Sequence, residues 1–344
     1  MTAHLAYAEG SPCPTLVLDS RALPGGEDGL LDALTTARGE LELHGSAHVL
    51  KNALIRPSAH PLFDLDYRFV QSLPGGPGRY DLRGSCGHSI LSSVVAGAEY
   101  GMLPALSPGQ RIRVNVLNNG DYVVCEVDAA EPGRVAFTIH LLCAPDTRVS
   151  GLLMTGEPVS TVRADGELVE VSLVSMGNPY AFVSAASLGV TTRDQLFSDD
   201  PVLYGRMTRI RSAACELLGW DPAGAFPKIA VLLADGDGAI AARAISVPSW
   251  HPTLAVTGAT CLGAAIQIAG TIPATLAGFA EEMVRIQTPG GRVLVRARTT
   301  GDEADPRLGW VSIGDKKVSY QGSFPLPASL THVQEDSACL PIPV

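Results

Sequence analysis

The stretch Gly84-Ser85-Cys86-Gly87-His88-Ser89-Ile90-Leu91 decides how the rest of this chain is interpreted. Its glycines predict a tight turn, and the apolar run that follows predicts a helix over about residues 87–101. Cys86 then lies at the helix start, where unpaired N–H groups and the helix dipole favour a thiolate. The same N–H groups can hold a carboxylate or an enolate oxygen. A thiol in this setting is suited to proton transfer at a carbon beside a carboxylate.

The composition describes a folded chain with room for two domains. The 344 residues are 46% hydrophobic and 17% charged, with a formal net charge of −10. The acidic balance and the absence of basic clusters argue against a nucleic-acid partner. No apolar stretch reaches the roughly 18–20 residues of a membrane span, and no signal-peptide pattern opens the chain. We therefore expect a cytoplasmic protein, a monomer or a homodimer, that acts on a small-molecule substrate.

The cysteines give no sign of a metal centre. Seven are scattered along the chain without a CxxC pair or a Cys/His cluster at metal-ligand spacing. An odd, dispersed set is typical of reduced thiols rather than of a disulfide framework. We expect no metal site and no disulfide.

The chain is organised as two cycles of short strands, each with one apolar helix that follows a small-residue turn. Residues 111–117 alternate strictly and precede Asn118-Asn119-Gly120, which predicts a hairpin. A second cycle begins near residue 150, and its helix opens at Thr257-Gly258-Ala259. A helix that is apolar on nearly all sides must be buried. We therefore predict an α+β fold in which each half curls a β-sheet around a central helix.

The elements that we expect are these. Strands are predicted over 15–18, 45–55, 68–71, 111–117, 123–127, 135–139, 168–174, 177–183, 229–233, 239–245, 283–287 and 292–298, and helices over 87–101, 201–218 and 257–266. A glycine- and proline-rich loop is expected at 74–78, and a proline-rich tail from about 322 is expected on the surface.

In this order the segments resemble the diaminopimelate epimerase-like superfamily, and most closely its PrpF branch of methylaconitate and methylitaconate isomerases and oxalomesaconate tautomerases. The segments that carry the resemblance are Tyr7–Pro24, Gly45–Ile55, Gly84–Ser89, Gly151–Gly156, Gly177–Pro179, His251–Ala265 and Arg285–Val293. The resemblance implies two pseudo-symmetric domains, 1–148 and 149–318, with 319–344 packing back on the first. It also implies an active site between them, toward which both central helices point their N-termini.

The resemblance further implies a proton shift without a cofactor, with Lys51 and Cys86 as the acid/base groups. Lys51 is the only charge in an otherwise apolar strand. It is either an edge-strand lysine that guards against aggregation or a desolvated base. For Cys86, the alternative to a catalytic role is that it is simply a small, buried cysteine.

The candidate substrate-binding residues flank these two groups. They are Gly87, His88, Ser89, Asn178, His251, Thr257, Gly258, Glu9 and Ser11. Each of the polar ones has a structural alternative: a helix cap for His88 or Ser89, turn chemistry for Asn178, a loop histidine for His251 and a solvated charge for Glu9. His88 could also tune the Cys86 thiol.

Several positions depart from the family pattern. Glu9 stands where a carboxylate-binding basic residue is expected, His88 replaces an asparagine, and Thr288-Pro289-Gly290-Gly291 replaces a loop that carries histidine. The second cysteine of the epimerases falls near Val256, so a two-thiol racemase is not expected, and Cys261 is expected to face the core. From Glu9 and the altered loop we predict a substrate other than a tricarboxylate.

These observations predict a cofactor-independent isomerase that moves a carbon–carbon double bond by a 1,3-proton shift. The expected substrate is a small carbonyl or carboxylate compound of specialised metabolism. Two alternatives remain open: a PhzF-like isomerase or cyclase on the same fold, and a non-catalytic small-molecule binder. Which of Lys51 and Cys86 is the base is also open.

Overall fold

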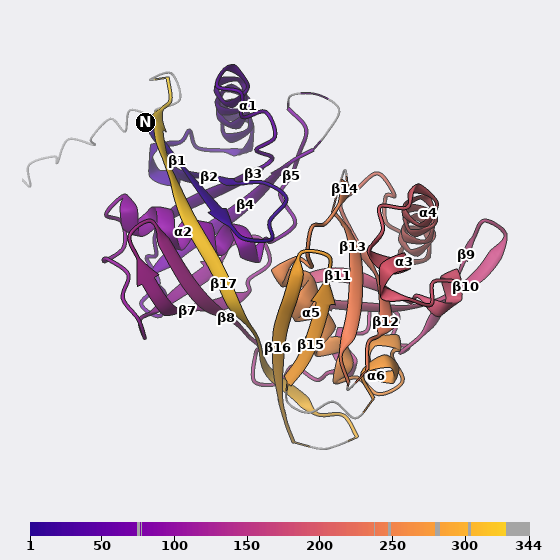
Figure 1. The fold of residues 1–344 in the computed structure, drawn as a ribbon. Coiled ribbons are helices and arrows are strands. Elements are labelled where there is room, and N and C mark those ends of the chain that lie inside the picture. Colours follow the sequence, from indigo (N-terminus) through magenta and orange to yellow (C-terminus); the bar gives the residue numbers. More distant parts are fainter. Residues whose placement is uncertain are drawn as a thin grey trace, which may run out of the picture.

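A long strand, β17 (Arg307–Pro325), connects two lobes of strands and helices in the computed structural model (Figure 1). The structure describes residues 1–327 except 74, 75, 77, 237, 247–248, 279–282 and 302–303. The loop expected at 74–78 falls mostly outside the described residues, and so does the tail beyond residue 327.

The first lobe arranges its strands around helix α2. Its elements are β1 (Thr2–Ala8), β2 (Thr15–Asp19), α1 (Glu27–Leu43), β3 (Lys51–Pro57), β4 (Leu65–Ser72), β5 (Tyr80–Asp81), α2 (Gly87–Glu99), β6 (Arg111–Val116), β7 (Tyr122–Glu131) and β8 (Arg134–Leu142). The pair β1–β2 is antiparallel, β2–β3 parallel, β3–β4 antiparallel and β4–β6 parallel. The pairs β6–β7 and β7–β8 are antiparallel, and β17 closes the circle between β8 and β1.

The second lobe repeats this order of strand pairings. Its elements are β9 (Ser160–Ala164), β10 (Glu167–Met176), β11 (Asn178–Ser184), α3 (Arg193–Phe197), α4 (Pro201–Leu218), β12 (Lys228–Ala234), β13 (Ile240–Ser246), β14 (Ser249–Trp250), α5 (Val256–Ile266), α6 (Ile272–Ala277), β15 (Met283–Thr288) and β16 (Gly291–Thr300). Pairing runs antiparallel from β10 to β11, parallel to β12, antiparallel to β13 and parallel to β15. The pairs β15–β16 and β16–β17 are then antiparallel.

The two central helices are buried, as their largely apolar sequences predict. Every residue of α5 is buried, and so is every residue of α2 from Gly87 to Gly97. Both helices contribute to one hydrophobic core with strands of both lobes. The predicted helices over 87–101 and 257–266 are therefore confirmed, as is the hairpin of β6 and β7, in which Val114 lies opposite Val123.

One predicted strand is shorter than expected. The strand predicted from residue 45 begins only at Lys51. Gly45 adopts a positive φ of 73° at the end of α1, and Ser46 donates its N–H back to the Leu41 carbonyl. These contacts turn the chain before the strand can start.

Helix α1 was not expected from the sequence. Its buried residues Leu30, Ala33, Leu34, Ala37 and Leu41 follow a helical period. Gly29 and Gly39 weaken the same segment as a helix, which obscures that period.

Among the described residues, no helix has both the length and the apolar character needed to cross a membrane.

Candidate functional site

The starts of α2 and α5 meet where the two lobes touch. A Cβ atom on Gly87 would overlap the side chain of Val256, the first residue of α5. A Cβ atom on Gly258 would lie 2.5 Å from the Tyr180 hydroxyl oxygen. Glycine at position 87 therefore allows the two helix starts to approach each other, and glycine at position 258 allows α5 to pack against Tyr180 of β11. Their unpaired N–H groups form the polar centre of the interface.

Cys86 is the residue directly before α2 and has an extended backbone, with φ −139° and ψ 105°. Its side chain is half-buried. Burial by itself raises the pKa of the Cys86 thiol, but the Lys51 ammonium, the hydroxyl and N–H of Ser89 and the Lys228 ammonium outweigh it and lower the pKa below its usual value. These neighbours therefore favour the thiolate form of Cys86.

Lys51 is the first residue of β3, and its side chain is buried. Its Nζ donates a hydrogen bond to Ser11 Oγ at 2.8 Å, and the Ser11 hydroxyl donates a hydrogen bond to the Cys13 carbonyl at 2.7 Å. An ammonium has three donors, so one contact with a neutral hydroxyl among the described residues leaves Lys51 with further donors for a ligand.

Asn178 connects the lobes from the first position of β11. Its Nδ2 donates to the Ser85 carbonyl at 2.8 Å and to Thr257 Oγ1 at 3.1 Å, while Oδ1 accepts from the Ser85 N–H at 3.1 Å. Both amide donors are therefore used within the protein. In this arrangement Asn178 holds the turn that carries Cys86 against the start of α5.

His88 and His251 form a buried pair between the helix starts. The two rings stack with centroids 6.0 Å apart and planes 18° from parallel. Burial, followed by the charges of Lys51 and other lysines, keeps the pKa of each imidazole well below its usual value. Both rings are therefore neutral at physiological pH.

Two lysines that the sequence analysis did not select also act on this site. Lys228 is the first residue of β12 and pairs with Tyr180 of β11, just as Lys51 begins β3 and pairs with Thr15 of β2. It is half-buried, and burial lowers the pKa of its ammonium. A comparison of the two strand cycles would have identified Lys228 as the counterpart of Lys51.

Lys316 is the second of these lysines and lies on β17. It is buried, and desolvation lowers its pKa to about 8. Its charge acts on both His88 and His251. No short motif surrounds this residue in the sequence, so only the path of β17 between the lobes places it here.

The structure gathers most of the predicted residues but places Glu9 elsewhere. Around Cys86 and Lys51 it brings together Ser11, Gly87, His88, Ser89, Asn178, His251, Thr257 and Gly258. Glu9 is half exposed and forms an ion pair with Arg134 on the surface.

Cys261 is buried, and its Sγ lies 3.3 Å from the Val174 carbonyl. Burial raises the pKa of this thiol to about 12. The predicted place of Cys261 in the core is therefore confirmed.

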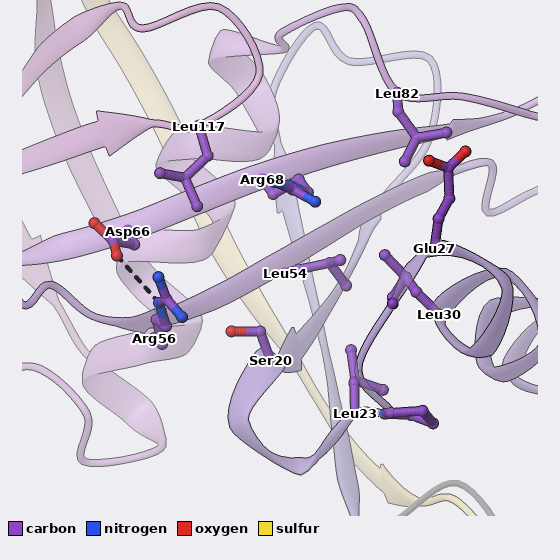
Figure 2. A pocket seen from close by; sticks show the side chains of 12 residues that line it. Ser20, Leu23, Glu27, Leu30, Leu54, Arg56, Asp66, Arg68, Leu82 and Leu117 are labelled. Carbon is purple, nitrogen blue, oxygen red and sulfur yellow. Dashed lines mark hydrogen bonds and ion pairs between the residues drawn. The ribbon is translucent and has the colours of Figure 1, made fainter. Parts of the chain in front are cut away.

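A groove in the first lobe lies apart from this cluster. It has a volume of about 460 Å³ and lies between α1 and strands β3 and β4 (Figure 2). Arg56 and Asp66 form an ion pair on its wall, with Nε 3.1 Å from Oδ2. None of the candidate site residues lines it, so we do not assign the active site to this groove.

A second groove, of about 480 Å³, lies between the lobes. Asn178 and Phe226 are among the residues that line it. Phe226 also packs on the turn before Cys86, because a Cβ atom on Gly84 would lie 2.6 Å from its ring. This groove is thus an opening beside the buried cluster.

Among the described residues, no three His, Cys, Asp or Glu side chains are grouped so that they could hold a metal ion.

Comparisons with known proteins agree with this architecture. A family model described as PrpF protein matches residues 43–314. The 3-methylitaconate isomerase of Eubacterium barkeri is 25% identical over 287 residues, 71% of this chain and 75% of that protein. The (4E)-oxalomesaconate Delta-isomerase of Novosphingobium sp. strain KA1 is 26% identical over 270 residues, 71% of this chain and 73% of that protein. A crystal structure of methylitaconate-delta-isomerase has the same fold, with a TM-score of 0.67, 22% identity and coverage of 94% of this chain and 95% of its own.

Proposed function

The chain belongs to the PrpF family and is an isomerase, and we propose that it moves a carbon–carbon double bond by a 1,3-proton shift without a cofactor. One observation carries the proposal. The half-buried Cys86 thiol lies at a helix start, where the buried Lys51 ammonium lowers its pKa. This arrangement supplies two groups that can exchange protons with a substrate.

The proposed reaction needs two proton transfers. Either Lys51 or Cys86, in its deprotonated form, removes a proton from the carbon next to the double bond. The electron pair moves through the double bond onto the carbonyl oxygen, which gives a dienolate. A proton returned at the far carbon regenerates the carbonyl group and leaves the double bond shifted. Backbone N–H groups at the starts of α2 and α5 stabilise the dienolate oxygen, each by on the order of 3 kcal/mol.

We also propose that the two lobes are pseudo-symmetric domains, residues 1–148 and 149–318. The repeated order of strand pairings supports this, and so does the matching position of Lys51 and Lys228. Residues 319–325 pair with β1 of the first lobe. In this arrangement the first domain supplies the thiol from the position directly before α2, while Ala255 occupies the position directly before α5.

The proposed substrate is a small anionic carboxylate or carbonyl compound. Lys51, Lys228 and Lys316 surround the histidine pair with positive charge, which favours an anion. The expectation that tricarboxylates are excluded rests on Glu9 and on the altered loop at 288–291, and the ion pair between Glu9 and Arg134 weakens the first of these two arguments. Tricarboxylates therefore belong among the compounds to be tested.

The proposal is tested by an isomerisation assay followed by proton NMR. The purified protein is incubated with 3-methylitaconate, oxalomesaconate and a panel of unsaturated mono- and dicarboxylates. We expect at least one compound to show movement of its double bond, and Cys86→Ser to lose that activity while Cys261→Ser keeps it. A cyclised product would identify a PhzF-like reaction instead, and binding without turnover would identify a non-catalytic binder.

A further inference from the structure

The imidazole of His88 is buried, and both of its ring nitrogens lack a hydrogen-bond partner within the described chain. Leaving a buried donor or acceptor unpaired costs about 1–3 kcal/mol, so such groups require an explanation. Here the ring also lies in the first turn of α2, two residues after Cys86. A bound substrate that pairs with the ring would account for this cost.

The surroundings of His88 fix its charge. Lys51 of β3, Lys228 of β12 and Lys316 of β17 all act on the ring and, together with burial and His251, oppose its protonation. A neutral imidazole has one N–H donor and one acceptor nitrogen. The ring can therefore donate a hydrogen bond without delivering a proton.

His251 is held in one tautomer by its own loop. Its Nδ1 lies 3.1 Å from the backbone nitrogen of Thr253, which can only donate. Since Nδ1 accepts this hydrogen bond, a neutral His251 carries its proton on Nε2. The loop therefore leaves Nε2–H of His251 as a donor beside the stacked ring of His88.

We propose that His88 and His251 are neutral hydrogen-bond donors that hold the substrate oxygen on which charge develops during proton removal. This inference rests on the proposed isomerase function. It adds two side chains to the backbone N–H groups that are proposed to stabilise the dienolate oxygen. A neutral imidazole at a helix start is known to polarise a carbonyl in proton-transfer enzymes, because it stabilises an enolate without neutralising it. The alternative, that His88 tunes the thiol, has less support, because the groups that lower the Cys86 pKa are Lys51, Ser89 and Lys228.

The charge state is tested first, without any substrate. Protein labelled with ¹⁵N-histidine is titrated by NMR from pH 5.5 to 8.5, and the signals are assigned with His88→Gln and His251→Gln. We expect both rings to stay neutral throughout, with the His251 proton on Nε2. An imidazolium at pH 7 at either position would overturn the proposal.

The second test uses oxalate, a planar dianion that imitates an enolate beside a carboxylate. Hydrogen bonds to a charged group contribute about 1.5–3 kcal/mol, so His88→Phe should weaken oxalate binding roughly ten- to hundredfold. His88→Gln, which keeps an N–H donor, should retain most of the affinity. Equal oxalate affinity in the wild type and His88→Phe would contradict the proposed contact.

The third test separates substrate binding from tuning of the thiol. The pH dependence of Cys86 alkylation by iodoacetamide is compared in the wild type and His88→Phe. We expect the same profile in both proteins, whereas a profile displaced to higher pH would assign His88 to the thiol. Neither this test nor the titration needs turnover. The histidine proposal can therefore fail while the isomerase proposal stands, and the isomerase proposal can fail while the histidine results hold.

Discussion

At the scale of single residues, the chemistry proposed for the site depends on the positively charged lysine side chains near the Cys86 thiol. Cys86 and Cys143 are both half-buried cysteines, yet their surroundings shift their pKa values in opposite directions. Burial and the charge of Asp121 raise the pKa of Cys143 to about 11, while at Cys86 Lys51, Ser89 and Lys228 together outweigh burial and lower the pKa. We therefore expect the Cys86 thiol to react faster with alkylating reagents than the Cys143 thiol.

Replacing Lys51 by methionine should slow the alkylation of Cys86 by iodoacetamide at pH 7.5. The substitution removes the charge that lowers the thiol pKa, so the thiolate forms only at higher pH. Peptide mapping by mass spectrometry measures the rate at Cys86 against Cys143 in the same sample. Lys317→Met, at a partly exposed position, is the matched control and should leave the rate unchanged. An unchanged alkylation rate in Lys51→Met would show that the charge of Lys51 does not lower the pKa of the Cys86 thiol.

Lys316→Met should stabilise the fold near neutral pH by roughly 2–3 kcal/mol, since it removes a buried charge whose pKa falls to about 8. In the wild type the unfolded chain binds this proton more tightly between about pH 8 and 10.5, so the free energy of unfolding should rise with pH in that window. Urea unfolding at pH 7, 8 and 10 measures both effects. A less stable Lys316→Met protein at pH 7 would contradict this reading.

At the scale of elements, the contact between α2 and α5 depends on the small residue at the start of α2. Gly87→Ala should destabilise the protein by about 1–3 kcal/mol and reduce turnover, because the added methyl group would collide with Val256 and separate the helix starts. The double variant Gly87→Ala with Val256→Ala should recover part of the stability. Thermal unfolding and the isomerisation assay provide the measurements.

The matched control is a glycine on the exposed side of a helix. Gly39 of α1 is exposed, and a Cβ atom there would meet open space. Gly39→Ala should therefore be neutral or stabilise the protein by about 0.5–1 kcal/mol through the helix preference of alanine. Equal losses from both alanine variants would mean that the contact between the helices is unimportant.

The elements also show what the sequence could and could not reveal. The apolar runs after Cys86 and after Ala255 predict buried helices because no polar face is available for solvent. Local pattern placed the start of the strand at residue 45, whereas Ser46 bonds back to α1 and delays it to Lys51. Lys228 could have been found by comparing the two strand cycles, whereas Lys316 reaches the histidine pair only through the folded path of β17. The surface pair of Glu9 with Arg134 joins residues that are 125 positions apart, which no local motif records.

At the scale of the whole molecule, function depends on how the lobes are held together. Asn178→Ala should cost about 2–4 kcal/mol, because it leaves both backbone groups of Ser85 unpaired in a buried place. It should also reduce turnover, since the turn before Cys86 loses its support from the second lobe.

Asn119→Ala is the control for this prediction. Asn119 also bridges the lobes, by donating to the Gly177 carbonyl at 2.9 Å, but it is exposed. Water can replace its hydrogen bond, so the expected loss is below about 1 kcal/mol. Urea unfolding of both variants decides whether the buried bridge matters more than the exposed one.

The central claim is that Cys86 and Lys51 exchange protons with a substrate carbon. The most direct measurement is the uptake of solvent deuterium in D₂O, followed by NMR and mass spectrometry, for the acid that the protein isomerises. We predict deuterium at the carbon that receives the proton, with no added cofactor, and a loss of several orders of magnitude in Cys86→Ser that retains the wild-type fold. Undiminished turnover and deuterium uptake in a well-folded Cys86→Ser protein would contradict the account.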